Sequence, residues 1–149
     1  MESLDRVLDV NLRGTFFLAQ AVAPKMRDAP ARDRPRSITT ATSASATIVS
    51  LDRAEYCVPK TALSKLFPLR LREMSITPYE VRAGVIRTDM SRLPAEKCDQ
   101  LIAAGLTPIA RWGKPEDVGR AIACLASDHV PLVTADTLHV DGGLHIHKL

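Results

Sequence analysis

Apolar residues recur along the chain with two spacings, one typical of helices and one typical of strands. From Leu4 to about Arg27 they are so dense that a long helix is predicted, covered by the rest of the protein on more than one side. From about Glu55 they recur near the helical period as far as Met74, which predicts a second long helix. The apolar positions of the first segment are Leu4, Val7, Leu8, Leu12, Phe16, Leu18, Ala19 and Val22.

Three short stretches have the composition of strands. Residues 37–42 predict one, although Ile38 is their only large apolar residue. Residues 81–86 predict a buried strand, and residues 137–140 predict the last one. Because strands and helices alternate, the chain is predicted to form an α/β layer with parallel strands.

Two further helices are predicted between the second and the last strand. The first spans residues 94–104, with Ser91 as its cap and Gly105 at its end. The second begins at Pro115, because proline suits the first helical position. Its inward face is expected to consist of Val118, Ala121, Ile122 and Leu125.

Composition agrees with a soluble globular protein of 149 residues, of which 46% are apolar and 25% charged. The net charge of +3 arises from 20 basic and 17 acidic side chains that are mostly interspersed. A basic cluster over residues 27–36 contains no aromatic residue on which bases could stack, so a solvated loop is expected there and no nucleic-acid partner.

Cys57, Cys98 and Cys124 are odd in number and fit no C-x-x-C pattern, which argues against disulfides and a zinc site and favours the cytoplasm. No apolar run is long enough to cross a membrane. His145 and His147 alternate near the C-terminus, but the sequence shows no carboxylate or third histidine placed to complete a site. No metal is therefore expected.

The segment Tyr56-Cys57-Val58-Pro59-Lys60 carries the chemistry of greatest interest. Residues four apart share a helix face, so the Lys60 ammonium can lie beside the Tyr56 phenol and lower its pKa from about 10. That change suits a general acid or base. Such a pair also occurs by chance on solvated helix faces, and only its neighbourhood distinguishes the two interpretations. Ser43 lies thirteen residues upstream, with Ser45 as a nearby alternative.

Six ordered segments are similar to the classical short-chain dehydrogenase/reductases, and among them to the 3-oxoacyl-acyl-carrier-protein reductase type. They are VNLRGTFFLAQAVA, TSASATIVS, YCVPKTALS, EVRAGVIRTDM, RWGKPEDVGRAIACLAS and VDGG, and they lie between Leu4 and Gly143. The resemblance implies that Tyr56 exchanges a proton with the substrate oxygen and that Ser43 hydrogen-bonds that oxygen. Lys60 would hold the nicotinamide ribose, and Asn11 would keep a relay water beside it.

The same resemblance implies a cofactor and partners. NAD or NADP would be bound by Tyr56 and Lys60, and its carboxamide by Ile86 and Thr88 in the loop after a strand. The substrate would be a small carbonyl compound or alcohol, such as a 3-oxoacyl thioester. The long first helix and the Tyr-Lys helix would pack against their copies in a homo-oligomer, or against full-length relatives.

Family members begin with a Gly-rich turn that takes the cofactor pyrophosphate, and no G-x-G-x-x-G can be built from the glycines of this chain. Residues 1–149 are therefore interpreted as one partial domain, the C-terminal half of a Rossmann-type doubly wound parallel sheet with about three strands. The edge of its first strand should be exposed. An inactive relic or an interaction module remains the alternative.

Two prolines depart from the family pattern. Pro59 is tolerable only if its helix begins at about Tyr56 or later, because proline lacks the backbone donor. Pro68, inside the predicted helix, is expected to cost about 3 kcal/mol or to kink it.

Overall fold

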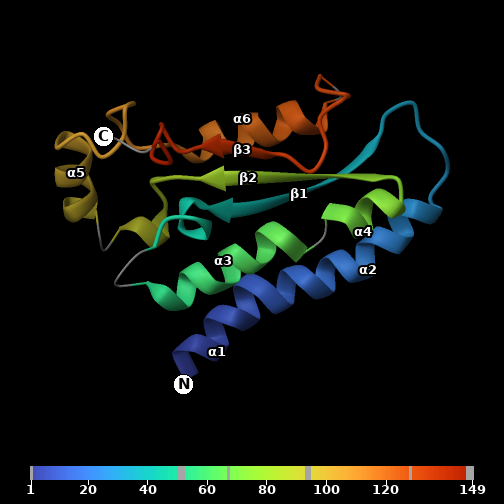
Figure 1. Cartoon of the computed structure of the whole chain (residues 1–149), viewed down its shortest axis with the longest axis horizontal. Coiled ribbons are helices and arrows are strands. Elements are labelled where there is room, and N and C mark those ends of the chain that lie inside the picture. The colour runs from blue at the N-terminus through green and yellow to red at the C-terminus, as the bar shows by residue number, and fades with distance from the viewer. Residues whose placement is uncertain (1, 50–52, 67, 93–94, 128, 147–149) are drawn as a thin grey trace.

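A parallel sheet forms the centre of the protein (Figure 1). The computed structural model describes residues 2–49, 53–66, 68–92, 95–127 and 129–146. Over these residues the strands are β1 (Arg36–Ser43), β2 (Ile76–Ala83) and β3 (Thr137–Val140), in the order β1-β2-β3. Thr39 pairs with Tyr79 and Val81 with Leu138, so β2 lies between the other two. The predicted α/β fold with parallel strands is confirmed.

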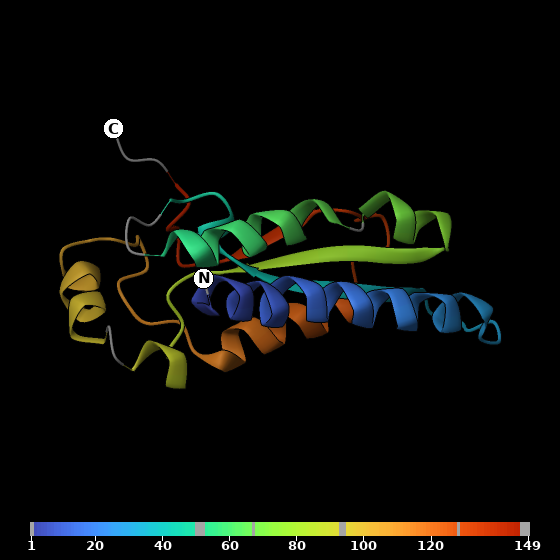
Figure 2. The ribbon, with the colours of Figure 1, turned by 90° about the horizontal axis from the view of Figure 1, so that it is seen from below.

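Helices cover both faces of this sheet. They are α1 (Glu2–Leu8), α2 (Gly14–Asp28), α3 (Ala54–Leu66), α4 (Pro68–Glu73), α5 (Ala95–Ala103) and α6 (Pro115–Ala126). Three short segments have other helical windings: η1 (Asp9–Arg13) is a π-helix, and η2 (Ala44–Ala46) and η3 (Asp89–Ser91) are 3₁₀-helices. Figure 2 shows α3 and α4 on one face of the sheet and α6 on the other. Helix α5 lies beyond the end toward which the strands point (Figure 1).

Strand β2 places apolar side chains on both faces, since successive residues point to opposite sides. The buried cluster on the α4 face consists of Ala23, Leu71 and Ile76. The buried cluster on the α6 face consists of Tyr79, Val81 and Leu125, with Val118 and Ile122 packed against it. Three of the four residues predicted for the inward face of α6 are thus confirmed, as are the bounds of β3.

The prediction for β2 was wrong in its bounds. The strand begins at Ile76 and ends at Ala83, whereas the apolar run suggested residues 81–86. Glu80 and Arg82 interrupt the apolar pattern, yet both are buried because each neutralises the other at 2.8 Å. A strand that buries a pair of charged residues is therefore not recognised in full from its apolar residues.

The two prolines have different outcomes. Helix α3 begins at Ala54, before Tyr56, and still contains Pro59, which is fully buried. The stated condition for tolerating Pro59 was therefore wrong. The long helix predicted as far as Met74 is divided into α3 and α4, and Pro68 is the first residue of α4, where a missing backbone donor is tolerated, so the predicted interruption at Pro68 is confirmed.

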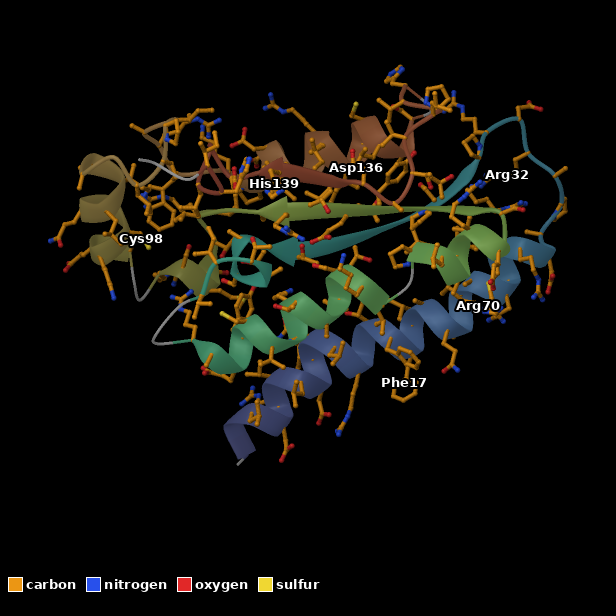
Figure 3. The ribbon with its side chains drawn as sticks, viewed as in Figure 1. Phe17, Arg32, Arg70, Cys98, Asp136 and His139 are labelled. Carbon is orange, nitrogen blue, oxygen red and sulfur yellow. The ribbon has the colours of Figure 1, made fainter. Side chains whose placement is uncertain are left out.

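The N-terminal helical segment is nearly continuous but changes its winding over η1, a π-helix closed by the Gly14 N–H donating to the Asp9 carbonyl. Val10, Phe17 and Leu18 are 69%, 60% and 65% exposed, and Phe17 points away from the sheet (Figure 3). The apolar pattern predicted that the rest of the protein would cover this helical segment on more than one side. The described residues do not provide that cover.

Several local expectations are settled by the loops and termini of helices. Gly105 has φ of +83° just past α5, which confirms it as the stop of that helix. Ser91 does not cap α5, because it belongs to η3 and exchanges hydrogen bonds with Thr88. All three cysteines are free. None of the helices in the described part of the chain has the length and hydropathy needed to cross a bilayer.

Candidate active site

The candidate residues gather at the carboxyl ends of the three strands. Strand β1 ends at Ser43, β2 is followed by Ile86 and Thr88, and β3 is followed by Asp141. Because the strands are parallel, their carboxyl ends lie at one edge of the sheet (Figure 1). Open parallel sheets bind ligands at this edge. The topology therefore places most of the predicted residues where a ligand is expected.

Ser43 and Tyr56 are brought together by the turn that follows β1 and by the first turn of α3. Ser43 is the N-cap of η2, and its Oγ accepts a hydrogen bond of 3.1 Å from the Ser45 backbone N–H. The Ser43 side chain also lies close enough to the Tyr56 phenol to lower its pKa. Of the two candidate serines, Ser43 reaches the phenol, while Ser45 contributes its backbone to holding Ser43.

The pKa of Tyr56 moves in the direction opposite to the one predicted. Burial raises it above the usual value near 10, and the hydrogen bond with Ser43 opposes that rise without cancelling it. The Lys60 Nζ lies 5.4 Å from the centre of the Tyr56 ring, so the predicted pairing on one helix face is present. At neutral pH, Tyr56 is consequently a protonated phenol, which is the form that can donate a proton.

Lys60 is half-buried, and burial lowers the pKa of its ammonium group. Within the ranges that the structure describes, Nζ makes no ion pair and no hydrogen bond. An ammonium group has three donors, and here they are available to hydroxyl or carbonyl oxygens of a ligand. Its position beside Tyr56 gives the site a positive charge next to the acidic proton.

Asn11 lies in η1, which packs against α3. The Asn11 side-chain amide donates a hydrogen bond of 3.1 Å to the Val7 carbonyl. The Asn11 backbone carbonyl accepts one of 3.2 Å from the Thr15 hydroxyl. Short π-helical segments inside α-helices are frequent at functional sites. Among the described residues, however, no hydrogen bond joins Asn11 to Lys60, so the two are linked only through the packing of their helices.

Ile86 and Thr88 lie in the loop after β2 and are not hydrogen-bonded to Tyr56 or Lys60 in the described structure. Ile86 bridges to Gly113, where a Cβ would come within 2.4 Å of the end of the Ile86 side chain, which would then have to move. Thr88 is exposed and begins η3. Beside it a hollow of about 560 Å³ is lined partly by Arg87 and Trp112, whose ring lies 4.5 Å from the guanidinium.

A second polar group, Glu80 and Arg82 in β2, was not foreseen as a pair. Their side chains are only 11% and 10% exposed. The Glu80 carboxylate accepts hydrogen bonds from Thr42, from Ser64 at 2.9 Å and from Thr137 at 3.0 Å. Burial raises the pKa of Glu80, but these hydrogen bonds and that of Arg82 together hold it below its usual value. This network lies on the face of the sheet that α3 covers.

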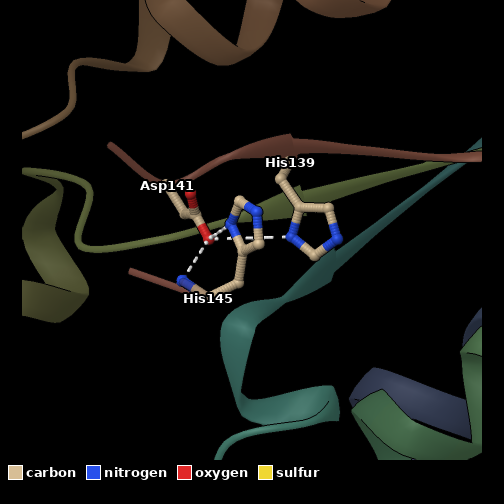
Figure 4. Close-up of side chains that lie close together, drawn as sticks. All are labelled: His139, Asp141 and His145. Carbon is tan, nitrogen blue, oxygen red and sulfur yellow. Dashed lines mark hydrogen bonds and ion pairs between the residues drawn. The ribbon is translucent and has the colours of Figure 1, made fainter. Parts of the chain in front are cut away.

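The sequence argument against a metal site was wrong on one point. A carboxylate and a further histidine do lie beside His145: Asp141 and His139 (Figure 4). His139 and Asp141 alternate along the chain and so share a face, which is the signal that could have found them. His147, the other histidine considered, lies outside the described residues.

Comparisons with known proteins agree with this arrangement. The family model described as Enoyl-(Acyl carrier protein) reductase matches residues 1–145. The 3-oxoacyl-[acyl-carrier-protein] reductase of Rickettsia felis is 32% identical over 146 residues, which are 96% of this chain and 58% of that protein. The chain thus spans little more than half the length of this curated relative.

Solved structures show the same likeness. The 3-oxoacyl-[acyl-carrier protein] reductase from Brucella melitensis in complex with NAD has a TM-score of 0.95 and 44% identity, over 99% of this chain and 60% of that one. The aldohexose dehydrogenase of Thermoplasma acidophilum has a TM-score of 0.86 and 28% identity, over 99% of this chain and 61% of that one.

Proposed function

The chain belongs to the short-chain dehydrogenase/reductase family, and we propose that it serves the reduction of a carbonyl compound by NAD(P)H, with a 3-oxoacyl thioester or a similar ketone as substrate. The predicted family and the predicted likeness to part of a Rossmann-type sheet are both confirmed. The observation that carries the proposal is that the Ser43 side chain and the Lys60 ammonium both lie beside Tyr56, the ammonium 5.4 Å from the centre of its ring. We assign residues 1–149 to the catalytic side of one such domain.

Tyr56 acts as the general acid in this proposal. Its O–H bond breaks as a new O–H bond forms on the substrate oxygen, and together with a hydride delivered to the carbonyl carbon this would turn the carbonyl into a secondary alcohol. The raised pKa keeps the phenol in its protonated form at neutral pH, so the proton that is to be transferred is present. The Lys60 ammonium then lies beside the phenolate that remains and stabilises its charge.

Ser43 fixes the substrate oxygen. Its Oγ already accepts from the Ser45 N–H, which leaves the Ser43 hydroxyl hydrogen to be donated to another oxygen. Directed at the carbonyl oxygen, that hydrogen stabilises the negative charge developing during reduction. In the structure described here the hydroxyl lies near the Tyr56 phenol. A carbonyl oxygen placed between the two side chains would therefore meet both of them.

The residues present fit the nicotinamide side of NAD(P)H. The cofactor supplies the hydride for the carbonyl carbon when it is bound. The half-buried Lys60, free of other partners among the described residues, suits a ribose hydroxyl, and the loop with Ile86 and Thr88 suits the carboxamide. Asn11, in the π-helix against α3, is proposed to hold the relay water that returns a proton. The chain contains no G-x-G-x-x-G to hold a pyrophosphate.

We further propose that the protein works as a homo-oligomer or together with longer relatives, in the cytoplasm. The exposed apolar side chains Val10, Phe17 and Leu18 along α1, η1 and α2 support such an association. The same surface favours the second candidate function, a catalytically inactive association module of the family. Turnover distinguishes the two.

The decisive experiment measures reduction of acetoacetyl-coenzyme A by the purified chain with NADPH, NADH and reduced nicotinamide mononucleotide in turn. The mononucleotide needs no adenosine site, so the absence of a Gly-rich turn does not prevent it from acting. Tyr56→Phe removes the acidic proton and should lower the rate by about 10² or more. Tyr79→Phe is the matched control, since these are the only two tyrosines and Tyr79 packs on the α6 face.

A rate that depends on Tyr56 and not on Tyr79 would support the enzyme. Equal rates for the parent chain and Tyr56→Phe would contradict the assigned proton donor. No turnover with any of the three donors would contradict catalysis by this chain and support the association module.

A further inference from the structure

His139, Asp141 and His145 bring three potential metal ligands together just after β3 (Figure 4). We propose that they bind one divalent cation of the zinc class, which fastens the segment after β3 to the end of the sheet. This site is independent of the Ser43, Tyr56 and Lys60 group and of the function proposed for it. Because it rests on separate residues, its test is separate as well.

The three ligand atoms are already close to one another. The Asp141 Oδ2 lies 2.8 Å from the Nδ1 of His145 and 3.6 Å from the Nδ1 of His139, and all three atoms lie within 4.8 Å of one another. Metal–ligand bonds of about 2.0–2.2 Å in a tetrahedral site separate ligand atoms by roughly 3.3 Å. The distance of 3.6 Å to His139 is close to that value, whereas the 2.8 Å to His145 is a hydrogen-bond distance that must lengthen by about half an ångström when the cation binds.

One of these ligand atoms is buried without a partner. The Nδ1 of His139 has no solvent exposure to speak of and no hydrogen bond in the described structure, since 3.6 Å to Asp141 is too long for one. A buried polar atom of this kind normally has a partner. A cation bound between His139 and Asp141 would provide it.

The backbone is built to hold the cluster in this form. Gly142 and Gly143 have φ of +65° and +87°, a conformation that favours glycine, and they turn the chain so that His145 returns over Asp141. The Asp141 carboxylate accepts from the backbone N–H groups of Gly143 at 2.9 Å and His145 at 3.1 Å. At Gly84 a Cβ would meet the Asp141 backbone at 2.6 Å, so β2 must approach closely here.

The ligands differ in burial. The Asp141 side chain is 1% exposed, while that of His145 is 39% exposed. On binding, the cation replaces the hydrogen bond between His145 and Asp141, and any proton shared by that pair leaves to solvent. The nearby Arg82 charge is neutralised by Glu80 at 2.8 Å, which limits its repulsion of the cation.

Two imidazoles and one carboxylate define the class of ion. Imidazole nitrogen suits zinc, copper, nickel and iron, whereas calcium and magnesium prefer oxygen ligands. Three protein ligands leave at least one position to water or to a ligand from elsewhere. Zn²⁺ is therefore the probe of choice, and Co²⁺, which has a visible spectrum, is the reporter of geometry.

The test titrates Zn²⁺ into the chelator-treated, tag-free chain and measures heat of binding, with a Co²⁺ absorption spectrum as the second readout. We expect one equivalent to bind with a dissociation constant below about 10 µM. His145→Gln and Asp141→Asn should each weaken binding at least 10-fold, and Zn²⁺ should raise the melting temperature of the parent only. His129→Gln, an exposed histidine outside the cluster, is the control and should bind as the parent does.

His145→Gln is the stronger variant, because His145 is exposed enough for the fold to survive its loss even if Asp141→Asn fails to fold. The absence of saturable binding at a ratio of one would overturn the proposal. So would unchanged affinity in His145→Gln, or a loss that occurs only in His147→Gln and therefore reports on the C-terminal segment.

Discussion

The two faces of the sheet differ in what they bury. On the α6 face, Tyr79 and Val81 of β2 meet Leu125 in an apolar cluster. On the α3 face, the neighbouring residues Glu80 and Arg82 point the other way and meet Ser64 and Thr42 in a buried polar network. One strand thus supplies an apolar core to one helix and a charged interior to another.

The difference separates stability from chemistry. The apolar face needs only shape and area, which many sequences provide. The polar face lies under the helix that carries Tyr56 and Lys60, and every polar atom there must be satisfied if the helix is to stay in place. We infer that the apolar clusters on the two faces hold the fold together and that the polar network under α3 positions the site, at a greater risk to stability.

The largest effect is expected from Arg82→Met, which leaves the buried Glu80 carboxylate without its ion pair. Removing one partner of a buried pair costs about 3–5 kcal/mol, and the free energy of unfolding in urea measures it. The double variant Glu80→Gln/Arg82→Met should recover part of that loss, because a neutral amide tolerates burial better. If the double variant is no more stable than Arg82→Met, the polar face does not depend on its charge pair.

A smaller loss, of about 2–3 kcal/mol, is expected from Leu125→Ala on the apolar face. The side chain is 8% exposed and packs against β2, so its removal leaves a cavity. Cys124→Ala is the matched control on the same helix, because Cys124 is exposed and should change stability by no more than about 0.5 kcal/mol. Equal losses for the two variants would show that α6 does not pack as described.

Acid should weaken the polar face before the apolar one. The pKa of Glu80 is held below its usual value near 4.5, so the stability it contributes is present above that pH and is lost as the pH falls through the lowered pKa. Unfolding free energies between pH 7 and pH 3 should therefore decrease less steeply for Glu80→Gln than for the parent. Leu125→Ala, as the comparison, should keep the slope of the parent.

The smallest effect on the folded chain is expected from Phe17→Ser, because this side chain is already exposed. Its unfolding free energy should change by no more than about 0.5 kcal/mol. If α2 is an oligomer surface, the same variant should shift the sedimentation of the protein toward the monomer. Unchanged sedimentation of an oligomeric parent would place the interface elsewhere.

The contrast between the faces also explains what the sequence could predict. The start of helix α6 and both bounds of β3 were predicted correctly, because a proline start and an apolar stripe leave a clear pattern. Strand β2 was placed five residues late at its start, since Glu80 and Arg82 satisfy each other only in three dimensions. An apolar pattern depends only on neighbouring residues in the sequence. Two charged residues that are buried together do not contribute to such a pattern.

The candidate site divides in the same way. The helical spacing correctly brought Lys60 to Tyr56, but the direction of the Tyr56 pKa shift depends on burial by the whole fold. The π-helix at Asn11 has no sequence signal, because it depends on how η1 packs against α3. The cluster around Asp141 depends on a glycine turn that brings His145 back to the strand.

The central claim is that the polar face holds Tyr56 as a protonated donor beside Ser43. The most direct measurement is the titration of phenolate absorbance in the Tyr79→Phe chain, where Tyr56 is the only tyrosine. We predict a midpoint above the usual value of 10, and a still higher one when Ser43→Ala removes the opposing hydrogen bond. A midpoint at or below 10, or one that Ser43→Ala leaves unchanged, would contradict the account.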